Sequence, residues 1–411
     1  MIPRLRTPDS TASLLREGYL FGTRGFDRVQ DEAFRTRLGL KPAVVMRGRD
    51  AARFFYEGGR FGRSRAMPDS VTHLLQDEGS VQTLDGAAHF ARKHEFVELL
   101  GVQGRGALVA AFAEQWQSAA ETWAGSTATV ELQTAAADIL AAAAMKWAGV
   151  PAPQTAASSR GPELVAMIES AARFGPPDWA ARARRRSTER WAGTLVTGVR
   201  SGSLTVDEAA PLNRLAHLQD ADGELLTPEV AAVELLNLLR PIVAVGRFVV
   251  FAALGLRRRP DWAERFAGGD RSEVRCFVDE TRRFYPFFPF IAGRARAGCV
   301  WHGHRFVAGD LAMLDLYGTN HDDRLWSDAG RFLPERFRDW NGDRNTLIPQ
   351  GGGEYAHGHR CPGEPATVEL MADAVMRLSS LRYELPEQDL RVSLRSVPAG
   401  PQSGFLMRVH S

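Results

Sequence analysis

Cysteine is scarce in this chain: only Cys276, Cys299 and Cys361 occur among its 411 residues. An odd, small number at wide spacing excludes a disulfide framework and favours a reducing compartment. The formal net charge is only +2 at pH 7, so neither a nucleic-acid-binding surface nor an acidic tail is expected. These absences predict a cytoplasmic protein with no nucleic-acid partner.

Long apolar runs are also missing. The longest, from Pro241 to Leu256, contains Arg247 and is too short and too charged to span a membrane. The first seven residues lack the apolar core of a signal peptide. No internal repeat or low-complexity linker is present. We therefore expect no stable membrane insertion and a single domain over residues 1–411.

Helical periodicity dominates what is present. Alanine- and leucine-rich stretches with this period cover 87–101, 104–121, 129–149, 161–172, 186–200, 206–219 and 228–256. Strand-like alternation is brief and late, at 390–394 and 404–409. Proline-rich segments at 150–162 and 174–178 predict loops. The pattern predicts a mainly α fold: one large helical domain with small β-sheets near its ends.

Cys361 lies between a glycine-rich loop, which begins at Gly351, and a helix-like run over 365–371. The positive end of a helix favours thiolate, the form of cysteine that binds metal. Glycines allow the backbone to approach a large flat group and leave N–H groups free to face a sulfur. A single thiolate held in this way is one means of supplying an axial ligand to haem iron. We predict that role for Cys361.

Two further motifs precede the cysteine loop. They are Glu280-Thr281-Arg282-Arg283 and Pro334-Glu335-Arg336-Phe337. In this order and spacing the three resemble the ExxR, PERF and haem-cysteine motifs of the cytochrome P-450 superfamily. The resemblance implies the cytochrome P-450 fold and haem b (heme b) with Cys361 as its thiolate ligand. It also implies that Glu280, Arg283 and Arg336 form a charge network that braces the haem-binding loop.

The cysteine loop departs from the usual pattern, because Glu354 stands where an aromatic residue is expected and the loop is longer. With its three consecutive glycines and the run Gly358-His359-Arg360-Cys361-Pro362-Gly363-Glu364, it resembles that of bacterial fatty-acid peroxygenases, the subgroup of fatty-acid α/β-hydroxylases and decarboxylases. This resemblance implies that hydrogen peroxide is the oxidant and that no redox partner is required.

The helix predicted over 228–256 contains no Ser or Thr after Thr227. Ordinary members of the superfamily use an acid–alcohol pair here. Arg240 and Pro241 lie in its middle instead. A buried guanidinium favours a carboxylate ligand, and the proline should kink the helix. The resemblance implies that Arg240 and Pro241 are catalytic, and that Arg240 binds the carboxylate of a long-chain fatty acid. That carboxylate then moves a proton between the peroxide oxygens. Alternatively, Asn237, Arg240 and Arg247 form one solvated stripe.

The remaining site residues follow from the resemblance. Gln82 takes the place where relatives carry Gln or His, and since it cannot act as an imidazole acid or base it favours hydroxylation at Cβ and Cα over decarboxylation to terminal alkenes. His89 and Lys93, four apart on one helix face, are expected to bind the haem propionates, together with His359 and Arg63. The acyl channel is expected to be lined by Phe287, Phe288, Phe290, Leu75 and Val71, for which core packing is the alternative.

Three other interpretations stay open. The chain could be a monooxygenase that depends on a redox partner, or a non-catalytic protein that binds haem and fatty acid. His357, His359 and Cys361 could instead form a zinc site. The sequence does not specify the native fatty acid and its chain length, the ratio of products, the oligomeric state or the source of peroxide.

Overall fold

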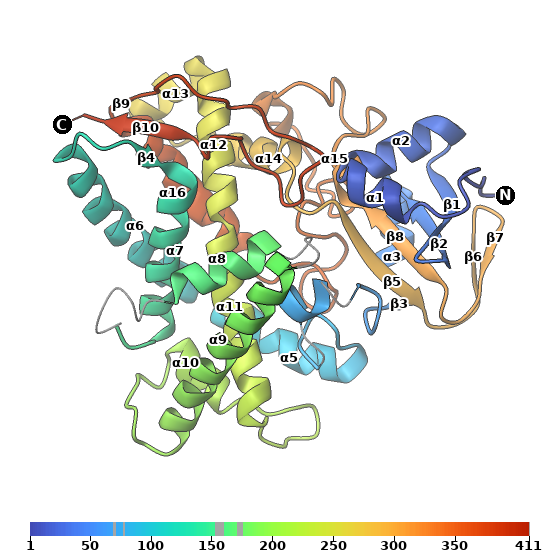
Figure 1. Ribbon diagram of the computed structural model, residues 1–411, viewed down its shortest axis with the longest axis horizontal. Helices are drawn as coiled ribbons and strands as arrows, with labels where there is room; N and C mark the ends of the chain where they lie inside the picture. The colour runs from blue at the N-terminus through green and yellow to red at the C-terminus, as the bar shows by residue number, and fades with distance from the viewer. Residues whose placement is uncertain (69–70, 77–78, 153–159, 171–175, 411) are drawn as a thin grey trace.

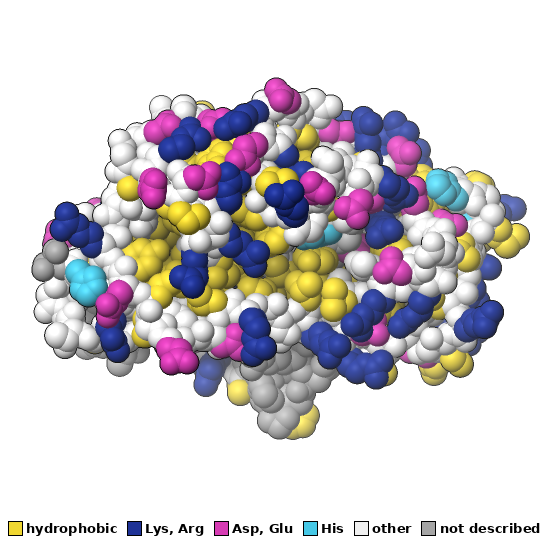
Figure 2. Space-filling view, turned by 90° about the horizontal axis from the view of Figure 1, so that it is seen from above, with side chains coloured by type: hydrophobic (Ala, Val, Ile, Leu, Met, Phe, Trp, Pro, Cys, Tyr) yellow, Lys and Arg dark blue, Asp and Glu magenta, His cyan; other side chains and the backbone are white. Residues whose placement is uncertain are grey.

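The computed structural model describes residues 1–68, 71–76, 79–152, 160–170 and 176–410. Helices form most of the molecule, and a smaller part built around a sheet lies at its N-terminal side (Figure 1). The mainly α fold with small β-sheets is therefore confirmed. On the face shown in Figure 2, side chains of both charge signs are interspersed around an apolar centre.

The helical part holds the larger hydrophobic core. Its helices are α5 (Gly86–Leu99), α6 (Val102–Ala124), α7 (Leu132–Ala148), α8 (Gly161–Ser170), α9 (Pro176–Arg200), α10 (Pro211–Ala216), α11 (Pro228–Ala244), α12 (Gly246–Arg258), α13 (Pro260–Ala267), α14 (Val274–Phe284) and α16 (Glu364–Ser380). The column formed by α11 and α12 packs against α7, and α12 also packs against α14 and α16. Helix α12 therefore contacts α14, which carries Glu280 and Arg283, and α16, which follows the cysteine loop.

The smaller part is built on a five-stranded sheet with strand order β1-β2-β8-β5-β3. These strands are β1 (Ala33–Leu38), β2 (Lys41–Met46), β8 (Leu311–Asp315), β5 (Phe290–Ala295) and β3 (Phe61–Gly62), with α1 (Thr11–Glu17), α2 (Leu20–Val29) and α3 (Arg49–Tyr56) beside them. Strands β2 and β8 pair in parallel, with Val45 opposite Met313. The sequence analysis missed this sheet because its strands are short and two of its pairings, β2 with β8 and β3 with β5, join segments more than 200 residues apart.

The remaining elements are short. They are η1 (Thr72–Gln76), α15 (Leu316–Asn320), η3 (Pro334–Phe337), the pair β6 (Cys299–Trp301) and β7 (His304–Phe306), and the sheet of β4 (Val130–Glu131), β10 (Leu406–Val409) and β9 (Tyr383–Glu384). The strand predicted near 404–409 is β10.

Two local predictions were wrong, and a third was wrong in part. The segment 390–394 is not a strand, because only Val392 forms an isolated bridge, to Pro401. At the start of β10, the backbone of Leu406 bonds to a side chain and not to a neighbouring strand. The amide of Gln388 donates to the Leu406 carbonyl and accepts from the Leu406 N–H. The helix predicted over 206–219 shrinks to the six residues of α10. Of the loop predicted at 174–178, residues 174 and 175 lie outside the described part, and 176–178 begin α9.

The long apolar helix starts at a hydroxyl cap, since the Thr227 side chain accepts from Val230 N–H. It passes through Pro241 and is interrupted only at Val245, between α11 and α12. Among the described residues, the joined helix over Pro228–Arg258 is long and apolar enough to cross a membrane. However, 89% of its most apolar window is buried inside the protein, as in the core helix of a soluble protein.

Candidate active site

Cys361 lies three residues before the start of α16, in a loop held by a hydrogen bond from its N–H to the Gln350 carbonyl at 3.2 Å. Burial raises the pKa of the Cys361 thiol, although the Gly363 N–H acts in the opposite direction. Burial thus opposes the effect predicted for the helix end, and the thiolate form of Cys361 stays a prediction for the protein with bound metal. A bound metal ion would deprotonate this thiol outright.

Gln350 approaches the same sulfur and was missed by the sequence analysis. Its side-chain amide nitrogen lies 3.9 Å from the Cys361 Sγ and donates to the Thr367 hydroxyl at 3.0 Å. Its amide oxygen accepts from Arg282 at 3.3 Å. The sequence carried no signal for this contact beyond the position of Gln350 at the start of the loop. Gln350 thus adds a side-chain donor to the surroundings of the thiol.

The glycines before Cys361 also have a local reason, besides the predicted approach to a large flat group. Gly351 and Gly353 have φ values of 94° and 78°, which favour glycine. A Cβ on Gly353 would lie 2.6 Å from the Cβ of Tyr56, in α3. The glycines therefore let the loop pack against Tyr56. Glu354, the unusual residue, accepts from the N–H groups of Ala356, His357 and Gly358, so it shapes the longer loop.

The ExxR residues form the expected charge network. Fully buried Glu280 pairs with Arg283 at 2.7 Å and with Arg336 at 3.2 Å. Arg283 also donates to the carbonyls of Asn320 and Ala329. This network supports the segment between α15 and η3, and it reaches the cysteine loop only indirectly, through the bond from Ile348 N–H to the Asn320 side chain.

The direct support comes from the neighbouring arginine, Arg282. It is buried between Asp279, at 2.7 Å, and Glu364 at the start of α16. Arg360, beside Cys361, pairs with the same Glu364. A buried guanidinium with two carboxylates is held firmly because losing one partner leaves an uncompensated charge. Arg282 therefore ties α14 to the helix that follows the cysteine.

The four side chains predicted to hold propionates lie close together. The rings of His89 and His359 are 3.9 Å apart, centre to centre. Lys93 donates to the carbonyls of the cysteine loop at 358 and 360. His359 pairs with Asp85 at 3.2 Å, and the backbone N–H of Arg63 donates to the same carboxylate at 3.0 Å, while the Arg63 guanidinium donates to the Ala292 carbonyl at 2.8 Å. Asp85, which also pairs with Arg296, is a member that the sequence analysis did not assign.

This cluster is crowded with basic groups. Burial, and then the neighbouring His359 and Lys93, lower the pKa of His89 to about 3. Burial also lowers the pKa of His359 to about 4 and that of Lys93 to about 8. Buried basic groups lose protons in this way when more of them meet than the local acids can balance. The cluster fits a group with anionic substituents, such as the propionates of haem.

Arg240 is buried on α11, and so the interpretation of a solvated stripe is wrong: Asn237 and Arg247 are buried as well. The guanidinium donates to the carbonyls of Leu74, at 3.2 Å, and Leu75, both in η1. Pro241 is exposed although both of its neighbours are buried. These contacts join the middle of the core helix to η1.

Gln82 lies in the turn before α5, where its side-chain oxygen accepts from the Ser80 hydroxyl at 2.9 Å. The preceding Val81 N–H donates to Glu234 of α11 at 2.9 Å. The loop that carries Gln82 is therefore fastened to the helix that carries Arg240. The sequence analysis assigned no role to Glu234, because the spacing along the chain gave no sign of this contact.

The residues predicted to line a channel have different surroundings. Phe287 stacks on Phe248 of α12 at 4.2 Å, and Phe288 is 43% exposed. Val71 directly precedes η1 and is half-buried. Phe290 instead lies in β5 and packs against Phe21 in the core of the smaller part. For Phe290, core packing describes the structure and the channel prediction does not.

The zinc alternative has no geometric support. Within the described ranges, no group of three or more His, Cys, Asp or Glu side chains could hold a metal ion. His359 faces Asp85, whereas His357 stacks on Phe90, with ring centres 5.0 Å apart. The cysteine, histidines and acids of the loop are therefore spread over separate contacts.

Comparisons with known proteins agree with this arrangement. Residues 274–403 match the family model "Cytochrome P450". Among curated proteins, a geissoschizine oxidase of Strychnos sp is 32% identical over 121 residues, which are 28% of this chain and 23% of that protein. The chain thus spans about a quarter of the length of the curated relatives it matches.

Solved structures match over nearly the whole chain. Cytochrome P450SP alpha (CYP152B1), in complex with (R)-ibuprophen, is 38% identical over 98% of this chain and 99% of that chain, with a TM-score of 0.94. Cytochrome P450EX alpha (CYP152N1), with myristic acid, is 36% identical over 99% and 98%, at 0.94. A variant of cytochrome P450 OleT, in complex with arachidonic acid, is 31% identical over 99% of this chain and 98% of that chain, with a TM-score of 0.95.

Proposed function

This chain belongs to the cytochrome P-450 family, within its CYP152 group, and on that premise we propose that it is a hydrogen-peroxide-dependent fatty-acid hydroxylase. Residues 1–411 would form one haem-thiolate domain. The observation that carries the proposal is a buried arginine, Arg240, beside an exposed Pro241, in a core helix that has no hydroxyl side chain after Thr227. That helix offers a carboxylate site in place of an acid–alcohol pair.

Cys361 would bind haem b through its thiolate, and His89, Lys93, His359 and Arg63 would hold the propionates. When bound, the haem would supply the redox centre that consumes peroxide, and thiolate donation favours O–O cleavage. Gln350 and the Gly363 N–H would moderate the charge on the sulfur. The Arg282–Glu364 pair would keep the loop in place.

Arg240 would bind the carboxylate of a long-chain fatty acid, with Leu75, Val71, Phe287 and Phe288 along its chain. Binding by the carboxylate leaves Cα and Cβ as the carbons held nearest the reacting centre, so oxidation falls on them. The same carboxylate would accept and return the proton of peroxide. Because Gln82 is neither acid nor base, hydroxylation should exceed decarboxylation.

The test is turnover of myristic acid by the purified holoenzyme with hydrogen peroxide and no reductase. We expect 2- and 3-hydroxy acids as the main products, identified by mass spectrometry. Turnover only with ferredoxin or flavodoxin would favour the monooxygenase. Binding without peroxide consumption would favour the carrier, and a dominant 1-alkene would contradict the assigned role of Gln82.

A further inference from the structure

A chain of polar side chains leads from Arg240 into the protein. Arg240 donates to the Asn237 side-chain oxygen at 2.9 Å, and the Asn237 amide nitrogen donates to Glu234 at 3.1 Å. The other Glu234 oxygen accepts from Arg92, of α5, at 2.6 Å. All four side chains are buried, and Glu234 is completely so. Burying four polar side chains between core helices costs free energy unless each of them makes its hydrogen bonds.

The direction of each bond in this chain is determined by Glu234. A carboxylate paired with a guanidinium only accepts hydrogen bonds, so Asn237 must turn its NH₂ group towards it. The Asn237 oxygen is then left facing Arg240. Burial raises the pKa of Glu234, while Arg92, Asn237 and the Val81 N–H act to lower it, so the ionised acceptor depends on these three partners. The charge of Glu234 thus decides which face of the amide Arg240 meets.

Glu234 also holds the other side of the site. The oxygen that accepts from Arg92 accepts from Val81 N–H as well, directly before Gln82. One carboxylate therefore contacts Arg240 through Asn237 and also binds the backbone of the loop that carries Gln82. Through these contacts Glu234 links Arg240 to the Gln82 loop.

We propose that Glu234 and Asn237 are positioning residues, which orient Arg240 towards the substrate carboxylate and fix the Gln82 loop relative to it. The inference rests on the proposed function. A fold often tolerates the replacement of a buried ion pair by apolar groups. The orientation of Arg240 therefore explains these buried polar side chains better than stability does.

Two variants of the holoenzyme test it. Asn237→Asp, of nearly identical shape, replaces the amide that donates to Glu234 by a carboxyl group and so breaks the chain of hydrogen bonds at this point. The new carboxyl group accepts from Arg240 and competes with the substrate, so the change should raise the Kd for myristic acid, measured by calorimetry, roughly tenfold. Glu234→Gln lets the Asn237 amide reverse and frees the loop. It should raise KM and change the ratio of 2- to 3-hydroxy product. Glu95→Gln is the matched control. Glu95 lies on α5, and the change removes the carboxylate partner of Arg214 without touching Arg92, Glu234, Asn237 or Arg240.

The outcomes separate the two proposals. Wild-type Kd and product ratio in a folded Asn237→Asp variant would overturn the inference and leave the proposed function standing. If wild-type enzyme neither binds nor oxidises myristic acid, both are wrong. If Glu234→Gln does not fold, the isosteric Asn237→Asp variant carries the test. A control variant that changed the product ratio as much as Glu234→Gln would reduce the effect to general destabilisation and overturn the inference.

Discussion

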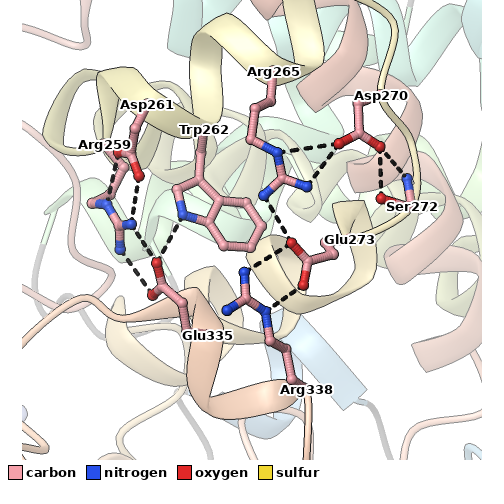
Figure 3. Close-up of polar contacts among 9 residues, drawn as sticks. All are labelled: Arg259, Asp261, Trp262, Arg265, Asp270, Ser272, Glu273, Glu335 and Arg338. Carbon is pink, nitrogen blue, oxygen red and sulfur yellow. Dashed lines mark hydrogen bonds and ion pairs between the residues drawn. The ribbon is translucent and has the colours of Figure 1, made fainter.

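Two networks of arginine and carboxylate side chains, similar in composition, differ in their exposure to solvent. One is the surface cluster between α13, the start of α14 and η3, drawn in Figure 3. Its members are Arg259, Asp261, Trp262, Arg265, Asp270, Ser272, Glu273, Glu335 and Arg338. The charged side chains of its ion pairs are between 21% and 59% exposed. In water such pairs contribute about 0–1 kcal/mol each.

The other is the buried relay Arg92–Glu234–Asn237–Arg240, in which the paired side chains of Arg92 and Glu234 are 7% and 0% exposed. Removing one partner there leaves a charge without solvent, at a cost of roughly 3–5 kcal/mol. The surface cluster has more ion pairs, yet each can exchange its partner for water. The number of salt bridges is therefore a poor guide to importance, because burial decides how much the loss of one partner costs.

The largest difference is expected for activity. Arg240→Ala should lower kcat/KM for peroxide-driven oxidation of myristic acid by at least roughly a hundredfold, because the substrate loses the group that places Cα and Cβ. Arg259→Ala, the same change in the surface cluster, should leave kcat/KM near wild type. Near wild-type turnover by Arg240→Ala would show that the two arginines do not differ as proposed.

The loss of a buried carboxylate should also lower stability more than the loss of an exposed one, and Glu280 provides the buried case. Glu280→Gln removes the buried counter-charge of Arg283 and Arg336, and should lower the free energy of unfolding by about 3–5 kcal/mol. Urea unfolding followed by circular dichroism measures this value. A loss as small as that of a surface variant would contradict the argument from burial.

Glu335→Gln, in the surface cluster, should lower the free energy of unfolding by less than about 1 kcal/mol. Hydrogen bonding to Arg259 lowers the pKa of Glu335 from 4.5 to about 2. For a lowered carboxyl pKa, the contribution is complete above about pH 4.5 and is lost as the pH falls towards 2. The difference in urea midpoint between wild type and variant should therefore shrink between pH 7 and pH 3. An increase at low pH would be the wrong sign.

The smallest effect is expected from Arg265→Ala. Arg265 pairs with Asp270 and Glu273 at the surface, where salt screens the interaction over about 3 Å at 1 M, compared with about 10 Å at 0.1 M. A small drop in the urea midpoint at low salt should vanish at high salt. A drop that persists in 1 M sodium chloride would show that this cluster is less exposed to solvent than its side chains indicate.

Sequence reasoning succeeded where the signal is local or a motif. It predicted the helical class, the helices around Arg240, and the charge pairing of Glu280 with Arg283 and Arg336. It failed where partners are distant in the chain: the five-stranded sheet joins segments near residues 40 and 310. It also placed Phe290 in a channel, because an aromatic residue carries no mark of which core it will join.

The sequence by itself determined the chemistry available to this protein: one cysteine in a glycine-rich loop, and an arginine before a proline in a helix without hydroxyl groups. These depend on residue identity and near spacing, which the chain states directly. Only the tertiary structure decided that Arg240 is buried and Arg259 exposed, that burial raises the pKa of Cys361, and that Glu234 meets Arg92 from 142 residues away. The reason is physical: the strength of a charge depends on its solvent and its partners, and folding brings both from elsewhere in the chain.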